Sequence, residues 1–104
     1  MKHIYLADLP DGGKVRPVVI LTRDVALPFL KRVTVAPITS TRHGIRTEVT
    51  VDESNGLDHE SVITCDNIQT IPKNLIGRRL GALSIGQEAH VTQAIRAAFD
   101  LLYS

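Results

Sequence analysis

The chain has 104 residues, of which 43% are hydrophobic and 22% are charged, as is typical of a soluble globular domain. Its longest apolar runs, such as residues 18–21, are too short to cross a bilayer, and the N-terminus lacks the apolar stretch of a signal peptide. A single cysteine, Cys65, excludes an internal disulfide and a zinc site built from cysteines. We therefore expect one cytoplasmic domain, spanning residues 1–104, without a structural metal.

The formal net charge of +1 conceals two segments of opposite sign. Residues 14–46 contain seven basic residues and one acid, whereas residues 47–66 contain six acids and no Lys or Arg. Such asymmetry suggests a basic surface for a polyanion. It also fits two segments whose strands lie side by side and whose charges pair. Composition leaves both interpretations open.

The first two thirds of the chain predict short strands separated by turn residues. Alternating and β-branched patterns place these strands at residues 3–7, 15–22, 32–39, 46–51, 60–65, 69–71 and 76–83, the last interrupted by glycines. We expect strand 3–7 at a sheet edge and strand 15–22, which is nearly continuous in apolar residues, at the centre. Pro17 has no N–H to donate, so it should mark the start of the paired region.

The hydrophobic period changes near the C-terminus. Ser84 and Gln87 have the spacing of a capping box, and good helix formers follow from residue 89 to 102. Apolar residues recur there at three-to-four spacing on one face, at Val91, Ala94, Ile95, Ala98 and Leu102. One helix packed on several short strands predicts a strongly bent antiparallel sheet or a partly open barrel.

Polar residues gather where two of the predicted strands meet loops. Arg16 directly precedes Pro17, which restricts Arg16 to extended backbone, and a guanidinium held there offers paired donors to a phosphate. Another strand ends in three hydroxyls and a second guanidinium, on Thr39, Ser40, Thr41 and Arg42. Adjacent strand ends would form a cradle for a phosphodiester. Taken alone, the residues favour plainer interpretations, a surface ion pair for Arg16 and a hydrogen-bonded turn over residues 39–41.

Motifs of several other enzyme classes are absent from the sequence. There is no His-Glu-x-x-His, paired-cysteine motif or Gly-x-Ser-x-Gly elbow, and Gly12-Gly13-Lys14 precedes a strand where a phosphate loop would precede a helix. His43 is interpreted as a solvated loop residue, and Cys65 as a small buried side chain.

Four blocks of the chain resemble one protein family. Residues 13–22 (GKVRPVVILT) and 33–41 (VTVAPITST) resemble the MazF/PemK toxins, which are sequence-specific bacterial endoribonucleases. Residues 61–71 (SVITCDNIQTI) resemble the third block of the family, and the chain from residue 76 onward resembles its C-terminal region. The resemblance therefore covers nearly the whole chain, in the expected order.

The resemblance implies an SH3-like barrel with a C-terminal helix, the type shared by the MazF, PemK and CcdB toxins. It also implies a homodimer that a MazE-like antitoxin neutralises. Family members cleave single-stranded RNA without a metal or other cofactor. The 2′-hydroxyl of the RNA attacks the neighbouring phosphate and leaves a 2′,3′-cyclic phosphate and a free 5′-hydroxyl.

The motif match also assigns roles to residues of this chain. Arg16 takes the position of the catalytic arginine and Thr39 that of the catalytic threonine, while Asp66 matches an aspartate implicated in catalysis or RNA contact. We expect RNA contacts from Lys14, Ser40, Thr41, Arg42, Arg46, Asp66, Asn67 and Gln69. The general base stays open between Asp66, a water molecule and a transiently deprotonated Arg16, because arginine normally remains protonated.

The chain departs from the PemK branch in two places. The loop at residues 8–15 lacks a His-Glu pair, and Thr64 stands where that branch has an arginine. Two alternative functions stay open: a toxin of the CcdB type, which binds DNA gyrase without cutting, and a decayed toxin that retains only antitoxin binding. In the leading interpretation, an acidic, disordered antitoxin tail docks on the basic segment and covers the RNA site.

Overall fold

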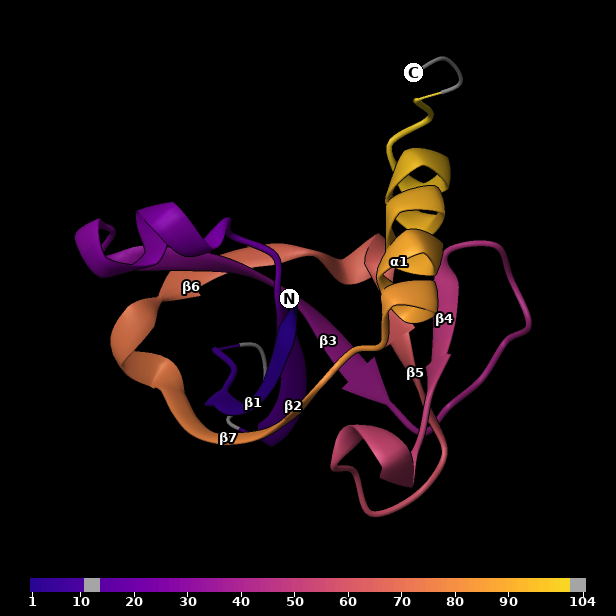
Figure 1. Ribbon diagram of the computed structural model, residues 1–104, viewed down its shortest axis with the longest axis horizontal. Coiled ribbons are helices and arrows are strands. Elements are labelled where there is room, and N and C mark those ends of the chain that lie inside the picture. The colour runs from indigo at the N-terminus through magenta and orange to yellow at the C-terminus, as the bar shows by residue number, and fades with distance from the viewer. Residues whose placement is uncertain (11–13, 102–104) are drawn as a thin grey trace.

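The computed structural model describes residues 1–10 and 14–101, which form a curled antiparallel sheet and a C-terminal helix (Figure 1). The strands are β1 (His3–Asp8), β2 (Val15–Ile20), β3 (Arg32–Thr39), β4 (Glu48–Val51), β5 (Ser61–Thr64), β6 (Gln69–Pro72) and β7 (Ile76–Ala82). The helix is α1 (Ile85–Ala98), and short 3-10 helices are η1 (Asp24–Phe29), η2 (Glu53–Asn55), η3 (Cys65–Asn67) and η4 (Lys73–Leu75). The predicted bent antiparallel sheet with a C-terminal helix is confirmed. The sequence analysis did not predict the 3-10 helices.

The curl of the sheet is produced by β3. The strand order is β4-β5-β3-β2-β1-β7, and β6 also pairs with β3. One edge of β3 pairs with β2, while its other edge pairs with β6 over residues 32–35 and with β5 at Ile38 and Thr39. One eight-residue strand is therefore shared between two smaller sheets, and the end of β3 lies where they meet.

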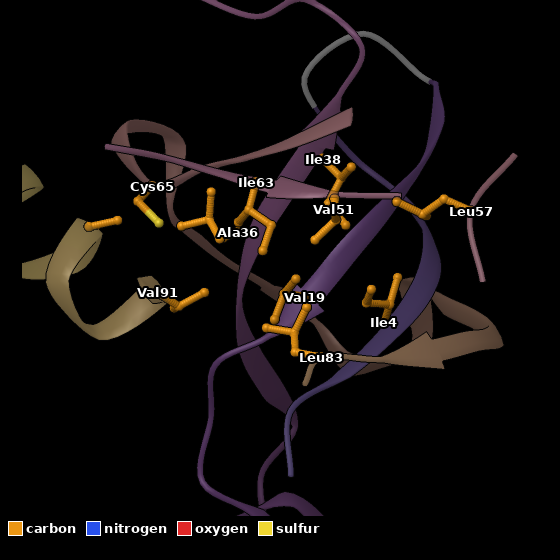
Figure 2. Close-up of a cluster of buried hydrophobic side chains, with 12 residues drawn as sticks. Ile4, Val19, Ala36, Ile38, Val51, Leu57, Ile63, Cys65, Leu83 and Val91 are labelled. Carbon is orange, nitrogen blue, oxygen red and sulfur yellow. The ribbon is translucent and has the colours of Figure 1, made fainter. Parts of the chain in front are cut away.

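Two apolar clusters hold the sheet together, and the alternation of β2 separates them. Val18 belongs to one cluster and Val19 to the other, as expected of a central strand buried on both faces. The cluster beside α1, called the helix-side core, is shown in part in Figure 2 and contains Ile4, Val19, Ala36, Ile38, Val49, Val51, Leu57, Ile63, Cys65, Leu83, Val91 and Ala94. The second core contains Ala7, Leu9, Val18, Ile20, Val33, Val35 and Ile71.

The predicted helix and its cap are confirmed. The Ser84 hydroxyl accepts the Gln87 N–H at 3.1 Å, and the Gln87 side chain accepts the Ser84 N–H at 2.9 Å. Val91 and Ala94 are buried on the predicted face, with Ile95 and Ala98 packed beside them. Leu102 lies outside the described residues. No helix within the described residues is long and apolar enough to span a membrane.

Two strand predictions need correction. β1 does not lie at an edge, since it pairs with β2 on one side and β7 on the other. Gly77 and Gly81 interrupt the pattern of β7, so the sequence predicted that strand only weakly and did not predict that it covers the second edge of β1. Pro17 marks the start of pairing on one side only: the β2–β3 ladder begins at Val18, whereas the β1–β2 ladder extends to Val15.

Candidate active site

A cleft of about 380 Å³ opens where β2 begins and β3 ends. Its walls come from these two strands, the segment that follows β3, and the end of β5 with η3. The lining residues are Leu9, Lys14, Arg16, Pro37, Thr39, Thr41, His43, Thr64 and Asn67. Segments far apart in the sequence therefore supply one concave surface.

The register of β2 and β3 brings Arg16 and Thr39 to the same wall. Val18 is paired with Pro37 in the antiparallel ladder. Arg16 and Thr39 follow two residues beyond this pair, past the end of the ladder, on the strand faces that carry Val18 and Pro37, and both line the cleft. The prediction that these two strand ends are adjacent is confirmed.

The cleft is cationic. Lys14 and Arg16 line it, and none of its described lining residues is an acid. Arg16 makes no ion pair within residues 1–10 and 14–101, so the described residues give no support to the plainer interpretation of Arg16 as a surface ion pair. A guanidinium in a concave wall that has no acid among its described lining residues favours the binding of an anion such as a phosphate.

The end of β3 also contains the hydrogen-bonded turn that the plainer interpretation predicted. The Thr41 N–H donates to the Thr39 hydroxyl oxygen at 3.3 Å. That bond uses an acceptor site of the hydroxyl and leaves its own proton free to donate. Turn formation and donation to a ligand are therefore compatible at Thr39.

Five predicted site residues line the cleft and five do not. The cleft brings together Lys14, Arg16, Thr39, Thr41 and Asn67. Outside its walls lie Ser40, Arg42, Arg46, Asp66 and Gln69. Contact of the outer five with a longer RNA stays a prediction.

Each of the outer residues has its own surroundings. Arg42 forms an ion pair with Glu60, Asp66 accepts the Thr47 hydroxyl at 2.7 Å, and Gln69 is paired with Val35 in the β3–β6 ladder. Arg46 lines a separate groove against α1, and Ser40 is exposed at the end of β3. Arg42 is also the only described residue of the basic segment that forms an ion pair with the acidic segment, so charge pairing between the segments is limited.

Sequence reasoning missed two polar lining residues. His43 is exposed, as predicted for a loop residue, but it also lines the cleft. Thr64 lines the cleft as well, and its hydroxyl oxygen is buried without a hydrogen-bond partner among the described residues. The position of His43 beside Arg42, just beyond β3, was the available signal.

Cys65 is not a nucleophile for this site. Its side chain is 1% exposed and belongs to the helix-side core. Burial, with a smaller contribution from the Asp66 carboxylate, raises the pKa of the thiol to about 11. The reactive thiolate form is therefore scarce near neutral pH. The described residues contain no cluster of three or more His, Cys, Asp or Glu side chains that could hold a metal ion.

Comparison with known proteins identifies relatives over almost the full length. Residues 2–99 match the family of PemK-like, MazF-like toxins of type II toxin–antitoxin systems. The chain is 52% identical over 101 residues to endoribonuclease MazF3 of Mycobacterium tuberculosis, covering 97% of this chain and 95% of that protein.

Solved structures show the same similarity. The Mycobacterium tuberculosis toxin MazF-mt6 superposes with a TM-score of 0.91 at 51% identity, covering 97% of this chain and 99% of that one. A mycobacterial endoribonuclease in complex with its cognate antitoxin superposes with a TM-score of 0.85 at 25% identity, covering 98% and 95%.

Proposed function

The chain belongs to the PemK-like, MazF-like toxins of type II toxin–antitoxin systems, and on that premise we propose that it is an endoribonuclease that cuts single-stranded RNA without a metal ion. The observation that carries the proposal is the cationic cleft that both Arg16 and Thr39 line, from two adjacent strands. Because the proposed substrate is RNA, we propose that the protein acts in the cytoplasm.

The proposed reaction is a transesterification within the RNA. The 2′-oxygen attacks the adjacent phosphorus, the bond from phosphorus to the 5′-oxygen breaks, and the products carry a 2′,3′-cyclic phosphate and a 5′-hydroxyl. Negative charge gathers on the non-bridging oxygens in the transition state. The Arg16 guanidinium and the Thr39 hydroxyl donate to those oxygens, and each donor of this kind contributes about 10²–10³-fold in rate.

Two protons move during this step. The 2′-hydroxyl loses one to a base, and the leaving 5′-oxygen takes one from water. The hydroxide that remains recovers the proton from the base. Among the described lining residues, His43 carries an imidazole, whose ring nitrogen can accept a proton, so it is the candidate acceptor. Asp66 is less well placed, because its carboxylate lies outside the cleft walls and accepts the Thr47 hydroxyl.

Sequence specificity follows from how RNA must bind for this reaction. In-line attack requires the nucleotides at the cut to be unstacked, and unstacked bases can be read at their edges and faces. The exposed residues Ser40 and Arg46 and the half-buried Gln69 lie beyond the cleft. They are the predicted contacts for the flanking nucleotides.

Substitutions at Arg16 and Thr39 test the function. We expect purified protein to cut a mixed RNA pool in EDTA, leaving 5′-hydroxyl ends. Arg16→Ala and Thr39→Val should each lower the cleavage rate by about 10²–10³-fold, because each removes a donor to the transition state. Lys31→Ala, which removes a charge at the opposite end of β3, is the control and should cut normally.

Other outcomes separate the alternatives. Undiminished cutting by Arg16→Ala, or 5′-phosphate ends, would contradict the mechanism. Intact RNA together with inhibited gyrase would favour a toxin of the CcdB type. Intact RNA with no growth arrest on expression would favour a decayed toxin.

We also propose a homodimer neutralised by a MazE-like antitoxin. Large apolar side chains on η1 support a second copy of the chain, since Val25 is 77% and Phe29 84% exposed. The cationic cleft supports an acidic antitoxin tail as its occupant. Sedimentation velocity tests the dimer, and competition between antitoxin and RNA tests occlusion; a complex that leaves the cleft open would contradict occlusion.

A further inference from the structure

The segment between β3 and β4 carries two lining residues of the cleft but belongs to no strand. Thr41 and His43 come from this segment, and residues 40–46 are all exposed. An exposed segment with few apolar contacts opens readily unless hydrogen bonds hold it. The placement of Thr41 and His43 in the cleft therefore depends on what fastens this segment.

The carboxylate of Glu48 holds the middle of the segment between β3 and β4 through hydrogen bonds. The His43 N–H donates to both oxygens of Glu48, at 3.0 and 3.1 Å, and the Gly44 N–H donates to one of them at 2.9 Å. The Glu48 N–H in turn donates to the Ile45 carbonyl at 3.1 Å. Gly44 has a φ of +69°, the left-handed backbone that favours glycine, so the chain turns sharply around the carboxylate.

Electrostatics strengthen this attachment. Burial raises the pKa of the Glu48 carboxyl, but the backbone N–H groups of His43, Gly44 and Ile45 and the charge of His43 lower it, and the net pKa is below the usual 4.5. Glu48 therefore carries a full negative charge at neutral pH. Hydrogen bonds to a charged acceptor are about twice as strong as bonds between neutral groups.

Glu48 is itself fixed to the sheet. It is the first residue of β4, and it is paired with Thr64 of β5 in the antiparallel ladder. Thr64 also lines the cleft. Glu48 thus connects two walls of the cleft, one through its carboxylate and the other through its strand pairing with Thr64, although it does not line the cleft itself.

We propose that Glu48 is a positioning residue for RNA cleavage, which holds the segment after β3 so that Thr41 and His43 face the bound phosphodiester. This proposal rests on the proposed function. Glu48 acts through the backbone of the segment and makes no contact with substrate in the cleft. A displacement of the segment by about 1 Å is enough to lower the rate by about 10²-fold.

The test compares Glu48→Gln and Glu48→Ala with the wild-type chain. Gln keeps one acceptor oxygen and loses the charge, whereas Ala loses both. We expect kcat for RNA cleavage to fall about 10-fold in Glu48→Gln and about 10²-fold in Glu48→Ala, with KM within about 2-fold of wild type, because Lys14 and Arg16 still bind the phosphate. Glu53→Gln, an equal charge change at an exposed position in η2, should leave kcat unchanged.

Amide hydrogen exchange provides a readout that does not depend on activity. Exchange at His43 and Gly44 should accelerate about 10-fold or more in Glu48→Ala, while amides of β2 and α1 keep their protection. Accelerated exchange with an unchanged kcat would overturn the positioning role, and unchanged exchange would overturn the attachment itself. Failure of the wild-type chain to cut RNA would instead refute the proposed function, which the exchange experiment does not require.

Discussion

At the scale of single residues, the proposed reaction needs two unlike groups at one phosphate, and Arg16 and Thr39 offer them. The guanidinium carries a full charge and only donors, and β2 holds it half-buried at the cleft wall. The Thr39 hydroxyl is oriented by the N–H of Thr41, which it accepts at 3.3 Å. Valine at position 39 would keep the shape of the side chain and lose both the turn bond and the donor. Thr39→Val therefore removes the hydrogen-bonding hydroxyl with little change in packing.

Cys65 leads to a prediction about stability at alkaline pH. Burial and the Asp66 charge raise the pKa of its thiol from the usual 9.0 to about 11, so the folded chain keeps this proton at pH values where the unfolded chain has lost it. The free energy of unfolding should therefore fall as the pH rises above about 9. Urea denaturation between pH 8 and 10.5 measures this fall. Cys65→Ala should show a shallower decline than wild type, and equal slopes would refute the assignment.

At the scale of elements, one buried amide joins η2, β7 and α1. The Asn55 side chain donates to the Ala82 carbonyl at 3.0 Å and to the Gln87 side chain at 2.7 Å, and its oxygen accepts the Asp52 N–H at 3.0 Å. Asn55 is 4% exposed, and these bonds satisfy its polar atoms. The same junction brings the backbones of η2 and β7 into close contact.

That contact makes Gly81 of β7 hard to replace. A Cβ atom at Gly81 would lie 2.0 Å from the Asn55 carbonyl oxygen, which is backbone and cannot rotate away. We expect Gly81→Ala to lower the free energy of unfolding by about 1–3 kcal/mol, the usual cost of overpacking, as measured by urea denaturation. Gly77→Ala on the same strand is the matched control, because its nearest atom would lie at 3.4 Å. Similar losses in the two variants would argue against the steric explanation.

At the scale of the whole molecule, the distribution of charge decides where a polyanion binds. The net charge is only +1, so the chain as a whole attracts RNA weakly. Lys14 and Arg16 concentrate positive charge at the cleft, while most of the acids of residues 47–66 lie outside it on β4, η2 and β5 or their flanking loops. RNA should therefore bind through a few local phosphate contacts.

Salt dependence measures the number of those contacts. With two phosphates neutralised, the affinity for a single-stranded RNA whose 2′-hydroxyl is absent at the cut should fall about 10-fold between 50 and 250 mM salt. Lys14→Ala should reduce the slope of log affinity against log salt by about 0.7. Fluorescence anisotropy gives both values. An unchanged slope in Lys14→Ala, or an equal reduction in Lys31→Ala, would show that RNA binds elsewhere.

The features that the sequence predicted well are those set by local chemistry. The alternation of β3, the capping box at Ser84 and the extended backbone before Pro17 depend on neighbouring residues only, and the structure contains all three. The adjacency of the two strand ends that carry Arg16 and Thr39 was a prediction from their polar residues, and both residues line one cleft.

Local sequence patterns therefore sufficed to predict the set of strands, the C-terminal helix and the chemical character of the two strand ends. Contacts in the folded chain were needed to establish that β1 is an interior strand, that His43 and Thr64 line the cleft, and that Arg42 forms an ion pair with Glu60. The positioning role proposed for Glu48 likewise follows from its hydrogen bonds to the segment after β3. The physical reason is that strand order and loop placement depend on contacts between residues distant in the chain, which no local pattern encodes.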